Sequence, residues 1–320
     1  MRFGINTQTR GPLATRNAYM AMADIGERYA YDFISVNDHV VIPAAISSHY
    51  PYSEEGSWSG AASGFCLDQL ATLSFLAGCT RSLRLLTSVM VVPHRPAVLT
   101  AKMLATADVL SQGRLILGVG AGWLKEEFDI LGAPYAGRGR ATDEYIEAFK
   151  VLWRDDRPVY NGDFVKFDNV KFEPKPVQKP HPPIWVGGES DAAMRRVVRH
   201  CDAWYPGSNN PARRLDTPAR LKAAIGDLHA MSEKAGRDPA TIDVALTVQW
   251  PVSWEAQKAT DGSRRVFTGS AADMAQDTAA LAGLGVSHVS LQLGTDSLEE
   301  TCARIQRFGE EVQPLVRAKS

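Results

Sequence analysis

Three alternating glycines end an apolar run of the chain: Gly118, Gly120 and Gly122, directly before Trp123. Glycine has no Cβ, so its repeated use at a strand end costs conformational entropy that a purely structural strand avoids. We therefore expect a planar cofactor to approach the backbone here. Two alternatives stay open. One is a dinucleotide-binding turn, although the pattern is GxGxG and helical periodicity resumes only near Thr142. In the other, the glycines only let a neighbouring helix pack closely.

A carboxylate and an imidazole stand side by side at the end of another apolar run, as Asp38 and His39 after Asn37. Such a pair at a strand end is suited to acid–base catalysis or to contact with a cofactor. The alternative is that Asp38 caps the following turn and that His39 is an exposed loop residue.

Hydroxyl groups interrupt a third apolar strand at Thr87 and Ser88, just before Val89. A barrel strand should be wholly apolar here, so we interpret the hydroxyls as ligand contacts. The alternative is that they satisfy local backbone groups.

A helix start follows two further glycines. Gly187 and Gly188 end a strand, and Glu189 and Ser190 lead into a helical pattern. The free amides and the positive dipole end of a helix start attract anions. A phosphate fits this turn better than a carboxylate does.

Metal and thiol chemistry are the competing hypotheses. The first strand carries no His-x-His pair, and the seven histidines are scattered, so we expect no metal site. His200, His229 and His288 are predicted to lie in or beside helices at the surface. The cysteines form no CxxC pair and are expected to be reduced and mostly buried: Cys66, Cys79, Cys201 and Cys302.

Short β-branched runs alternate with helical patterns along the whole chain, which indicates repeated βα units and a parallel sheet. We count eight units and predict an α/β fold, a (β/α)8 TIM barrel formed by residues 1–320 as one domain. The predicted strands are residues 3–7, 33–37, 83–91, 114–119, 183–187, 203–206, 242–249 and 288–293.

Three segments break this rhythm and are predicted insertions at the C-terminal face: residues 38–64, 157–182 and 250–267. The last helix is predicted to run from Leu298 to Leu315, with apolar residues on one face. Helix starts are predicted at Thr217, before a proline, and at Ser270, and Gly285 is predicted to end the helix that begins at Ser270.

The composition excludes several partners. Hydrophobic residues make up 45% of the chain and charged residues 22%, with a formal net charge of −1. Without a basic cluster, binding to nucleic acid or to an anionic membrane is not expected. The chain begins with a strand pattern instead of a signal peptide, and we expect a cytoplasmic protein.

Together these segments resemble the luciferase-like monooxygenase superfamily, and within it the coenzyme F420-dependent oxidoreductases. The resemblance covers nearly the whole chain. It rests on Asn-Asp-His-Val-Val-Ile-Pro at 37–43, Thr-Ser-Val at 87–89, Pro-His-Arg-Pro at 93–96, Leu-Ser-Gln-Gly-Arg-Leu at 110–115, Gly-Val-Gly-Ala-Gly-Trp at 118–123, Glu-Glu-Phe at 126–128 and Pro-Pro-Ile-Trp-Val-Gly-Gly at 182–188.

The resemblance implies a flavin or deazaflavin across the C-terminal face of the barrel, and a homodimer. It implies a cis peptide bond between Ser88 and Val89 behind the cofactor ring, and contacts of Asp38 and His39 with the ring or the substrate. The other residues that it places at the cofactor are Thr87, Gly118, Gly120 and Gly122, and at the phosphate-bearing tail Gly187, Gly188, Glu189 and Ser190.

The chain also departs from parts of this family. Ala121 stands where sugar-phosphate dehydrogenases of the family have an acidic residue and many FMN-dependent relatives have an arginine. Pro43 stands near a position where those dehydrogenases have a tryptophan. Both differences argue against a sugar-phosphate substrate, and the first also argues against FMN.

The expected function is hydride transfer between a deazaflavin and a small organic substrate, with His39 handling the proton. The side chains expected to wall the substrate pocket are His94, Trp58, Trp123, Trp250 and Trp254. One alternative is a two-component monooxygenase that receives reduced FMN from a separate reductase. The other is a flavin-binding protein without catalytic activity. A separate flavin or F420 reductase is the partner that these hypotheses require.

Overall fold

The computed structural model describes residues 1–317. The strands are β1 (Arg2–Thr7), β2 (Phe33–Val36), β3 (Arg84–Thr87), β4 (Met90–Val91), β5 (Leu115–Gly120), β6 (Tyr160–Asn161), β7 (Lys166–Phe167), β8 (Ile184–Gly187), β9 (Ala203–Tyr205), β10 (Asp243–Pro251) and β11 (Val286–Gln292). The α-helices are α1 (Arg16–Arg28), α2 (Gln69–Cys79), α3 (Ala97–Leu110), α4 (Lys125–Leu131), α5 (Arg138–Arg154), α6 (Asp191–His200), α7 (Pro218–Lys234), α8 (Ala271–Gly283), α9 (Leu298–Glu311) and α10 (Gln313–Arg317). Short 3-10 turns are η1 (Ser59–Ala62), η2 (Val92–His94) and η3 (Pro239–Thr241).

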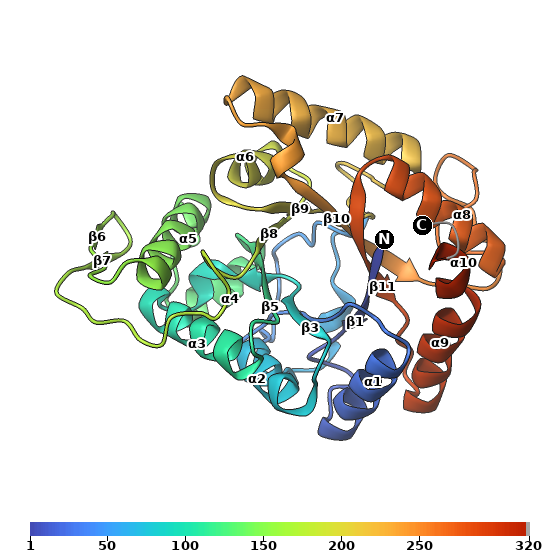
Figure 1. The fold of residues 1–320 in the computed structure, drawn as a ribbon, viewed down its shortest axis with the longest axis horizontal. Helices are drawn as coiled ribbons and strands as arrows, with labels where there is room; N and C mark the ends of the chain where they lie inside the picture. The colour runs from blue at the N-terminus through green and yellow to red at the C-terminus, as the bar shows by residue number, and fades with distance from the viewer. Residues whose placement is uncertain (318–320) are drawn as a thin grey trace.

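Within residues 1–317, eight parallel strands close into a barrel, with the helices arranged around it (Figure 1). The order around the sheet is β3-β2-β1-β11-β10-β9-β8-β5, and pairing of β3 with β5 closes the ring. Each predicted strand overlaps one of these eight. The predicted (β/α)8 fold is therefore confirmed.

Large apolar side chains fill the inside of the barrel. The rings of Phe33 and Trp185 meet edge to face, with their centroids 6.0 Å apart. Gly4 makes room for Phe33, since a Cβ added at Gly4 would lie 2.0 Å from that ring. Strands covered on both faces read as continuous apolar runs, which is why the sequence pattern revealed them.

His288 corrects one prediction. It lies on β11 with only 3% of its surface exposed, and its ring packs against Trp185 at 4.8 Å. Burial, together with the charges of Arg2 and Arg84, lowers the pKa of His288 to about 3. The side chain is a neutral part of the barrel interior, because it packs against the rings of Phe33 and Trp185 from other strands.

The last helix is also shorter than predicted. The helix α9 ends at Glu311, α10 follows as a separate helix, and Leu315 is 41% exposed. The predicted helix starts are confirmed, since Thr217 and Ser270 both cap their helices through side-chain oxygens. Gly285, with φ of +89°, follows the end of α8 as predicted.

The insertions extend the barrel. Residues 157–182 contain the antiparallel pair β6–β7, which projects at the left edge of Figure 1. Residues 38–64 follow β2 and contain η1. Among the described residues, no helix combines the length and the apolar character needed to cross a bilayer.

Candidate active site

A cavity of about 700 Å³ opens at the carboxyl ends of the barrel strands, beneath the insertion that follows β2. Active sites of (β/α)8 barrels lie at this face. Among the residues singled out from the sequence, those that line the cavity are Asp38, His39, Ser88, Val89, Gly120, Gly122, Gly187, Gly188, Glu189 and Ser190.

Thr87 and Gly118 do not line this cavity. The Thr87 hydroxyl donates a hydrogen bond to the carbonyl of Gly118 at 2.7 Å, inside the barrel wall. A Cβ at Gly118 would lie 2.0 Å from the Thr87 carbonyl oxygen. The structure thus corrects the expected cofactor contacts: Thr87 satisfies a backbone group, and Gly118 allows two strands to approach closely.

Val89 forms a shelf between two glycines at the floor of the cavity. The peptide bond between Ser88 and Val89 is cis, as the resemblance predicted. A Cβ at Gly120 would lie 2.7 Å from Val89 Cγ2, and one at Gly187 would lie 2.8 Å from Val89 Cγ1. Gly120 and Gly187 therefore admit the close packing of Val89, whereas Gly122 admits Phe128 of α4, the kind of helix contact that the alternative held.

Protein groups bind both oxygens of the Asp38 carboxylate. Arg95 binds both of its oxygens at 2.9 Å, and the amide of Val91 donates to it at 2.9 Å. Arg95 also binds Asp68 at 2.7 Å. Burial alone would lower the pKa of Arg95, but Asp38 and Asp68 raise it. Asp38 thus holds the β2 and β4 ends together at the wall of the cavity, and its contact with ring or substrate stays a prediction.

His39 is held by a carboxylate that is distant in sequence. Its Nδ1 lies 2.8 Å from Oε2 of Glu127, whose side chain is completely buried on α4. Glu127 Oε1 also accepts from the amides of Val40 and Val41 at 2.7 and 3.1 Å. Burial would raise the pKa of Glu127, but the hydrogen bond from His39 and the further contacts lower it. An ionised Glu127 therefore binds Nδ1 and leaves Nε2 for the cavity.

Glu126 and Glu127 are adjacent in sequence but bind different groups. Glu126 accepts hydrogen bonds from the hydroxyls of Ser47 and Ser48 at 2.6 and 2.7 Å, which lowers the pKa of Glu126 to about 2. It anchors the insertion after β2. Successive helix residues point about 100° apart, so Glu126 reaches Ser47 and Ser48 of the insertion while Glu127 turns inward to His39. In the sequence both residues stood out only as part of a motif, and helical periodicity was expected to resume only near Thr142, whereas α4 begins at Lys125.

A cluster of aromatic rings, the aromatic cover, lies at one side of the cavity. Trp58 packs over His39 with ring centroids 4.4 Å apart, and Trp123 lies 5.7 Å from Trp58 and 5.1 Å from Tyr50. Trp58 and Trp123 line the cavity, as expected.

Three other expected wall residues lie elsewhere. Trp250 is buried and donates to the carbonyl of Val266, and Trp254 donates to Glu311 on α9. His94 lies against Phe128, and burial lowers its pKa. None of these three lines the cavity.

The start of α6 forms the opposite corner of the cavity. Gly188 has φ of +101°, a conformation that favours glycine, and Ser190 caps the helix by accepting from the amide of Ala193 at 3.2 Å. The first amides of a helix have no partner within the helix. Arg196 also lines the cavity and pairs with Asp143. The corner therefore offers backbone donors and a helix dipole to an anion.

The Glu189 carboxylate accepts its hydrogen bonds from protein groups. It accepts from the amide of Gly207 at 2.5 Å and from Asn210 at 2.7 Å, and Tyr52 donates to it from the insertion at 3.5 Å. Burial raises the pKa of Glu189. Its contacts join the insertion to the end of β9, and its contact with the phosphate-bearing tail stays a prediction.

Metal binding and thiol chemistry are the two competing hypotheses. No group of three His, Cys, Asp or Glu side chains within residues 1–317 is arranged to hold a metal ion. The four cysteines are free, and of these only Cys201 is fully buried. The expectation that the thiols are mostly buried is therefore wrong, because Cys79 is exposed and the other two are half-buried.

Comparison with known proteins gives a family match. The model of the luciferase-like monooxygenase family matches residues 1–305. An uncharacterised protein of Mycobacterium tuberculosis is 33% identical over 262 residues, which are 81% of this chain and 89% of that protein. An FMNH(2)-dependent dimethylsulfone monooxygenase of Pseudomonas putida is 35% identical over 164 residues, 50% of this chain and 43% of that enzyme.

Solved structures share the fold. The monooxygenase RslO1 from Streptomyces bottropensis superimposes with a TM-score of 0.72 at 22% identity, covering 98% of this chain and 99% of that one. An F420-dependent secondary alcohol dehydrogenase, solved with an F420–acetone adduct, gives a TM-score of 0.72 at 17% identity, with 99% of each chain covered.

Proposed function

The chain belongs to the luciferase-like monooxygenase family, and we propose that it is an oxidoreductase that uses coenzyme F420 to transfer hydride to or from a small organic substrate. The observation that carries this proposal is the arrangement around the 700 Å³ cavity. His39 stands on one wall, the Val89 shelf forms the floor, and the amides of α6 form a far corner.

The residues present fit a deazaflavin. A planar ring needs a flat apolar support, and Val89 with its flanking glycines supplies one. The start of α6 suits the phosphate of the tail. When bound, the cofactor supplies or accepts the hydride, and the protein supplies orientation and a dry site.

The lack of an arginine at position 121, where many FMN-dependent relatives of the family have one, favours F420 over FMN. Arg196 is already paired with Asp143, so the net attraction comes mainly from the helix start, which is equivalent to roughly half a positive charge. FMN carries a phosphate monoester of about −1.5 to −2 charge at neutral pH. Coenzyme F420 carries a phosphodiester with a single negative charge. Ala121 adds no cation on this side of the cavity.

The proton is handled by His39. Glu127 binds Nδ1 at 2.8 Å, which orients the ring and favours one tautomer. Nε2 is then the nitrogen that donates to or accepts from a substrate oxygen. Trp58 and Trp123 cover this position and exclude water.

The second candidate function is an FMN-dependent monooxygenase with a separate reductase. It is favoured by the similarity to the dimethylsulfone monooxygenase over half of this chain. The same cavity would then hold reduced FMN, and the aromatic cover would keep water from the reacting oxygen species. It differs from the first candidate in its cofactor and in its consumption of oxygen.

Cofactor titration tests both candidates. We expect F420 to bind at least about 10-fold more tightly than FMN, a difference of roughly 1.4 kcal/mol. Ser190→Asp keeps a good helix cap but adds a negative charge at the phosphate corner. It should weaken F420 binding about 10-fold while leaving riboflavin, which has no phosphate, unaffected. Dissociation constants are measured by fluorescence titration.

The matched control is Ser297→Asp, because Ser297 caps α9 in the same way and does not line the cavity. It should leave all dissociation constants unchanged. Tighter binding of FMN than of F420, with oxygen consumed during turnover, would favour the second candidate. If neither cofactor binds, both candidates are wrong.

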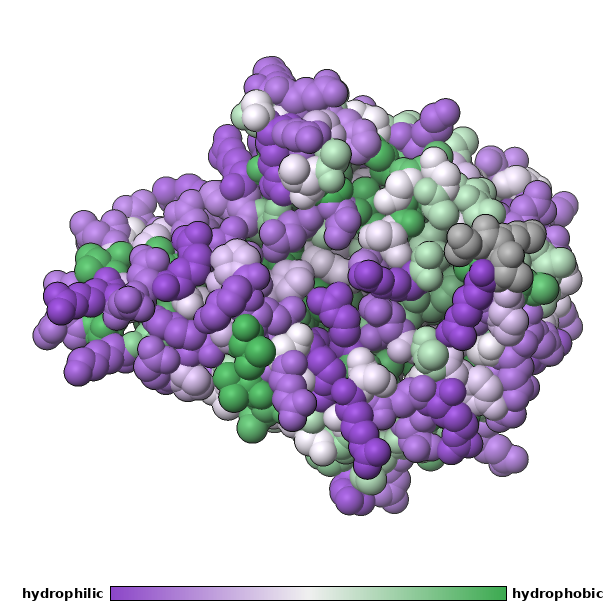
Figure 2. Space-filling model, in the orientation of Figure 1, coloured by the Kyte–Doolittle hydropathy of each residue, from purple (hydrophilic) through white to green (hydrophobic). Residues whose placement is uncertain are grey.

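We also propose a homodimer that forms through α3. This helix is apolar on its outer side as well, where Val98, Leu99, Val109 and Leu110 are exposed. Figure 2 shows an apolar patch near α2 and α3 on a mostly hydrophilic face. Lys102, a charge on this helix, is already bound to the carbonyl of Glu173. Exposed apolar patches of this kind mark interaction sites, and a second copy with the same patch is the complementary partner.

Leu99→Glu should convert the dimer to a monomer, because it buries two uncompensated charges at a twofold contact. Val159→Glu is the control, since Val159 is 62% exposed but lies beside the β6–β7 hairpin, away from α3. Sedimentation equilibrium measures both masses. A monomeric wild-type protein, or a Leu99→Glu variant that stays dimeric, would exclude this interface.

A further inference from the structure

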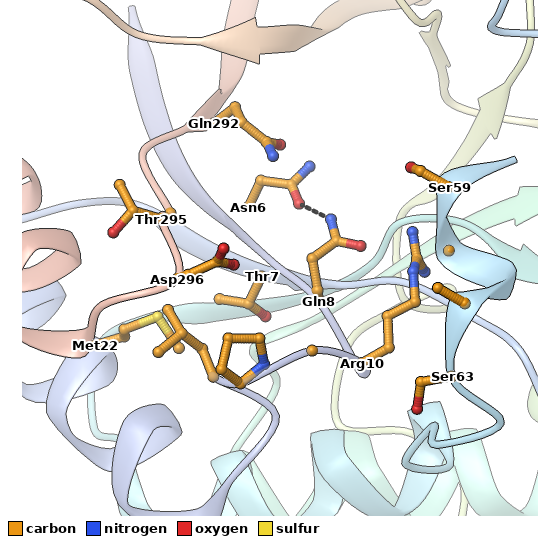
Figure 3. Close-up of a pocket in the computed structure, with 16 residues that line it drawn as sticks. Asn6, Thr7, Gln8, Arg10, Met22, Ser59, Ser63, Gln292, Thr295 and Asp296 are labelled. Atoms are coloured by element: carbon orange, nitrogen blue, oxygen red, sulfur yellow. Dashed lines mark hydrogen bonds between the residues drawn. The ribbon is translucent and has the colours of Figure 1, made fainter.

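A second, smaller pocket adjoins the main cavity. It has a volume of about 390 Å³ and lies between the end of β1, the loop after β11 and the η1 turn of the insertion (Figure 3). Both cavities are lined by Asn6, Gln8, Arg10, Ser59 and Gln292. A molecule bound in the main cavity can therefore extend into the smaller one.

Arg10 stands at the junction of the two cavities without an ionic partner. Within residues 1–317 it forms no ion pair, and its Nη1 is buried without a hydrogen-bond partner. Its guanidinium lies over the ring of Trp58, 5.0 Å from the centroid. In Figure 3 its side chain extends beside the pocket, next to η1. Burial lowers the pKa of Arg10. Arg10 as a whole is half-buried, but a desolvated cationic N–H without an acceptor is costly, and an anionic ligand would remove that cost.

The other residues that line the small pocket indicate the chemistry of the rest of such a ligand. Pro12, Leu13 and Met22 line the small pocket and suit an apolar chain. Gln8 donates to Asn6 at 3.2 Å, and its Oε1 is buried without a partner, so the amides there can bind uncharged polar groups. Asp296 lines the pocket and is exposed. Its charge disfavours a second acidic group on the ligand.

The cofactor's phosphate corner is on the other side of the barrel. In the ring of eight strands, β8 is separated from β1 by β9, β10 and β11. The two strands are thus opposite one another, with α6 at the end of β8 and Arg10 after β1. An anion on Arg10 is therefore a different group from the phosphate proposed at α6.

We propose that the substrate is an organic monocarboxylic acid whose carboxylate binds Arg10 while its apolar part occupies the 390 Å³ pocket. The reacting group, carried close to the carboxylate, then lies in the main cavity, which His39 also lines. This inference rests on the proposed function and names the substrate class. Guanidinium groups bind carboxylates with two parallel hydrogen bonds, so Arg10 suits this group better than a neutral carbonyl.

Binding of small acids without turnover tests the inference. The probes are hexanoate and benzoate, each compared with its amide, titrated calorimetrically into the protein with and without F420. We expect each acid to bind about 10- to 100-fold more tightly than its amide. Arg10→Gln should abolish this preference, and Arg10→Lys should keep part of it. Arg28→Gln is the control, because Arg28 is exposed and pairs with Asp24 far from the pocket.

The outcomes separate this inference from the proposed function. Equal affinity for acid and amide in the wild-type protein overturns the inference. It is also overturned if Arg10→Gln weakens F420 binding but leaves the acid preference intact, since Arg10 would then serve the cofactor. If the acid preference holds but neither F420 nor FMN binds, the inference stands and the proposed function fails. Circular dichroism of each variant verifies that it is folded.

Discussion

His39→Ala should lower kcat by about 10²- to 10⁴-fold, the usual contribution of a general acid or base. The imidazole lines the cavity, with Nδ1 bound to Glu127 and Nε2 left for the substrate, whereas Arg95 binds both oxygens of Asp38. Alanine removes the proton carrier but leaves the α6 corner and the shelf intact. The dissociation constant of F420 should therefore change little. Steady-state kinetics and fluorescence titration measure the two effects.

Glu127→Gln should lower kcat in the same way as His39→Ala, but by less. Glutamine keeps the shape of the side chain but removes the charge that holds Nδ1. Misplacing a catalytic group can cost about 10²-fold, so we expect kcat to fall by roughly 10- to 100-fold with an unchanged KM. A Glu127→Gln variant in which KM rises while kcat falls would indicate a structural role for Glu127 instead of a positioning role.

His229→Ala is the matched control, because His229 lies on α7 and does not line the cavity. It should retain wild-type kinetics. A His39→Ala variant with kcat within about threefold of the wild type would remove His39 from the mechanism, because a proton carrier contributes far more.

Gly118→Ala should destabilise the protein severely. The added Cβ would lie 2.0 Å from the backbone oxygen of Thr87, which sits in a paired strand and cannot move aside like a flexible side chain. Overpacking of a core costs about 1 to 3 kcal/mol and occasionally more, and a clash with backbone belongs at the upper end. We expect Tm to fall by several degrees and the soluble yield to drop. Thermal and chemical unfolding measure the loss.

Gly226→Ala should raise the stability of the protein instead of lowering it, and it serves as the control. Gly226 lies inside α7, and a Cβ there would meet nothing within 4 Å. Alanine in a helix interior is favoured over glycine by about 0.5 to 1 kcal/mol, so this variant should be slightly more stable. A Gly118→Ala variant as stable as the wild type would contradict the close contact between β3 and β5.

The fold was largely predictable because it depends on local and periodic signals. Buried parallel strands leave apolar runs, and helix starts such as Thr217 and Ser270 leave capping residues. Errors arose where those signals are weak. The position of His288 and the break before α10 depend on packing against distant elements, which one-dimensional periodicity does not record.

The residues at the barrel mouth were also predictable, because parallel strands end at one face. Asp38, Ser88, Gly120 and Gly187 are far apart in sequence, yet strand-end position alone brought them to one cavity. The role of each side chain was not predictable in this way. Thr87 and Gly118 face each other inside the wall, although their neighbours Ser88 and Gly120 face the cavity.

By itself, the sequence determined the barrel, the face that carries the site and the family resemblance, since these depend on residue types and their periodicity. Only the tertiary structure decided that Arg95 binds Asp38, that Glu127 holds His39 and that Arg10 forms no ion pair within residues 1–317. Those facts depend on side-chain distances between segments up to 88 residues apart. A charged group's chemistry follows from its nearest partners, and only folding brings those partners within reach.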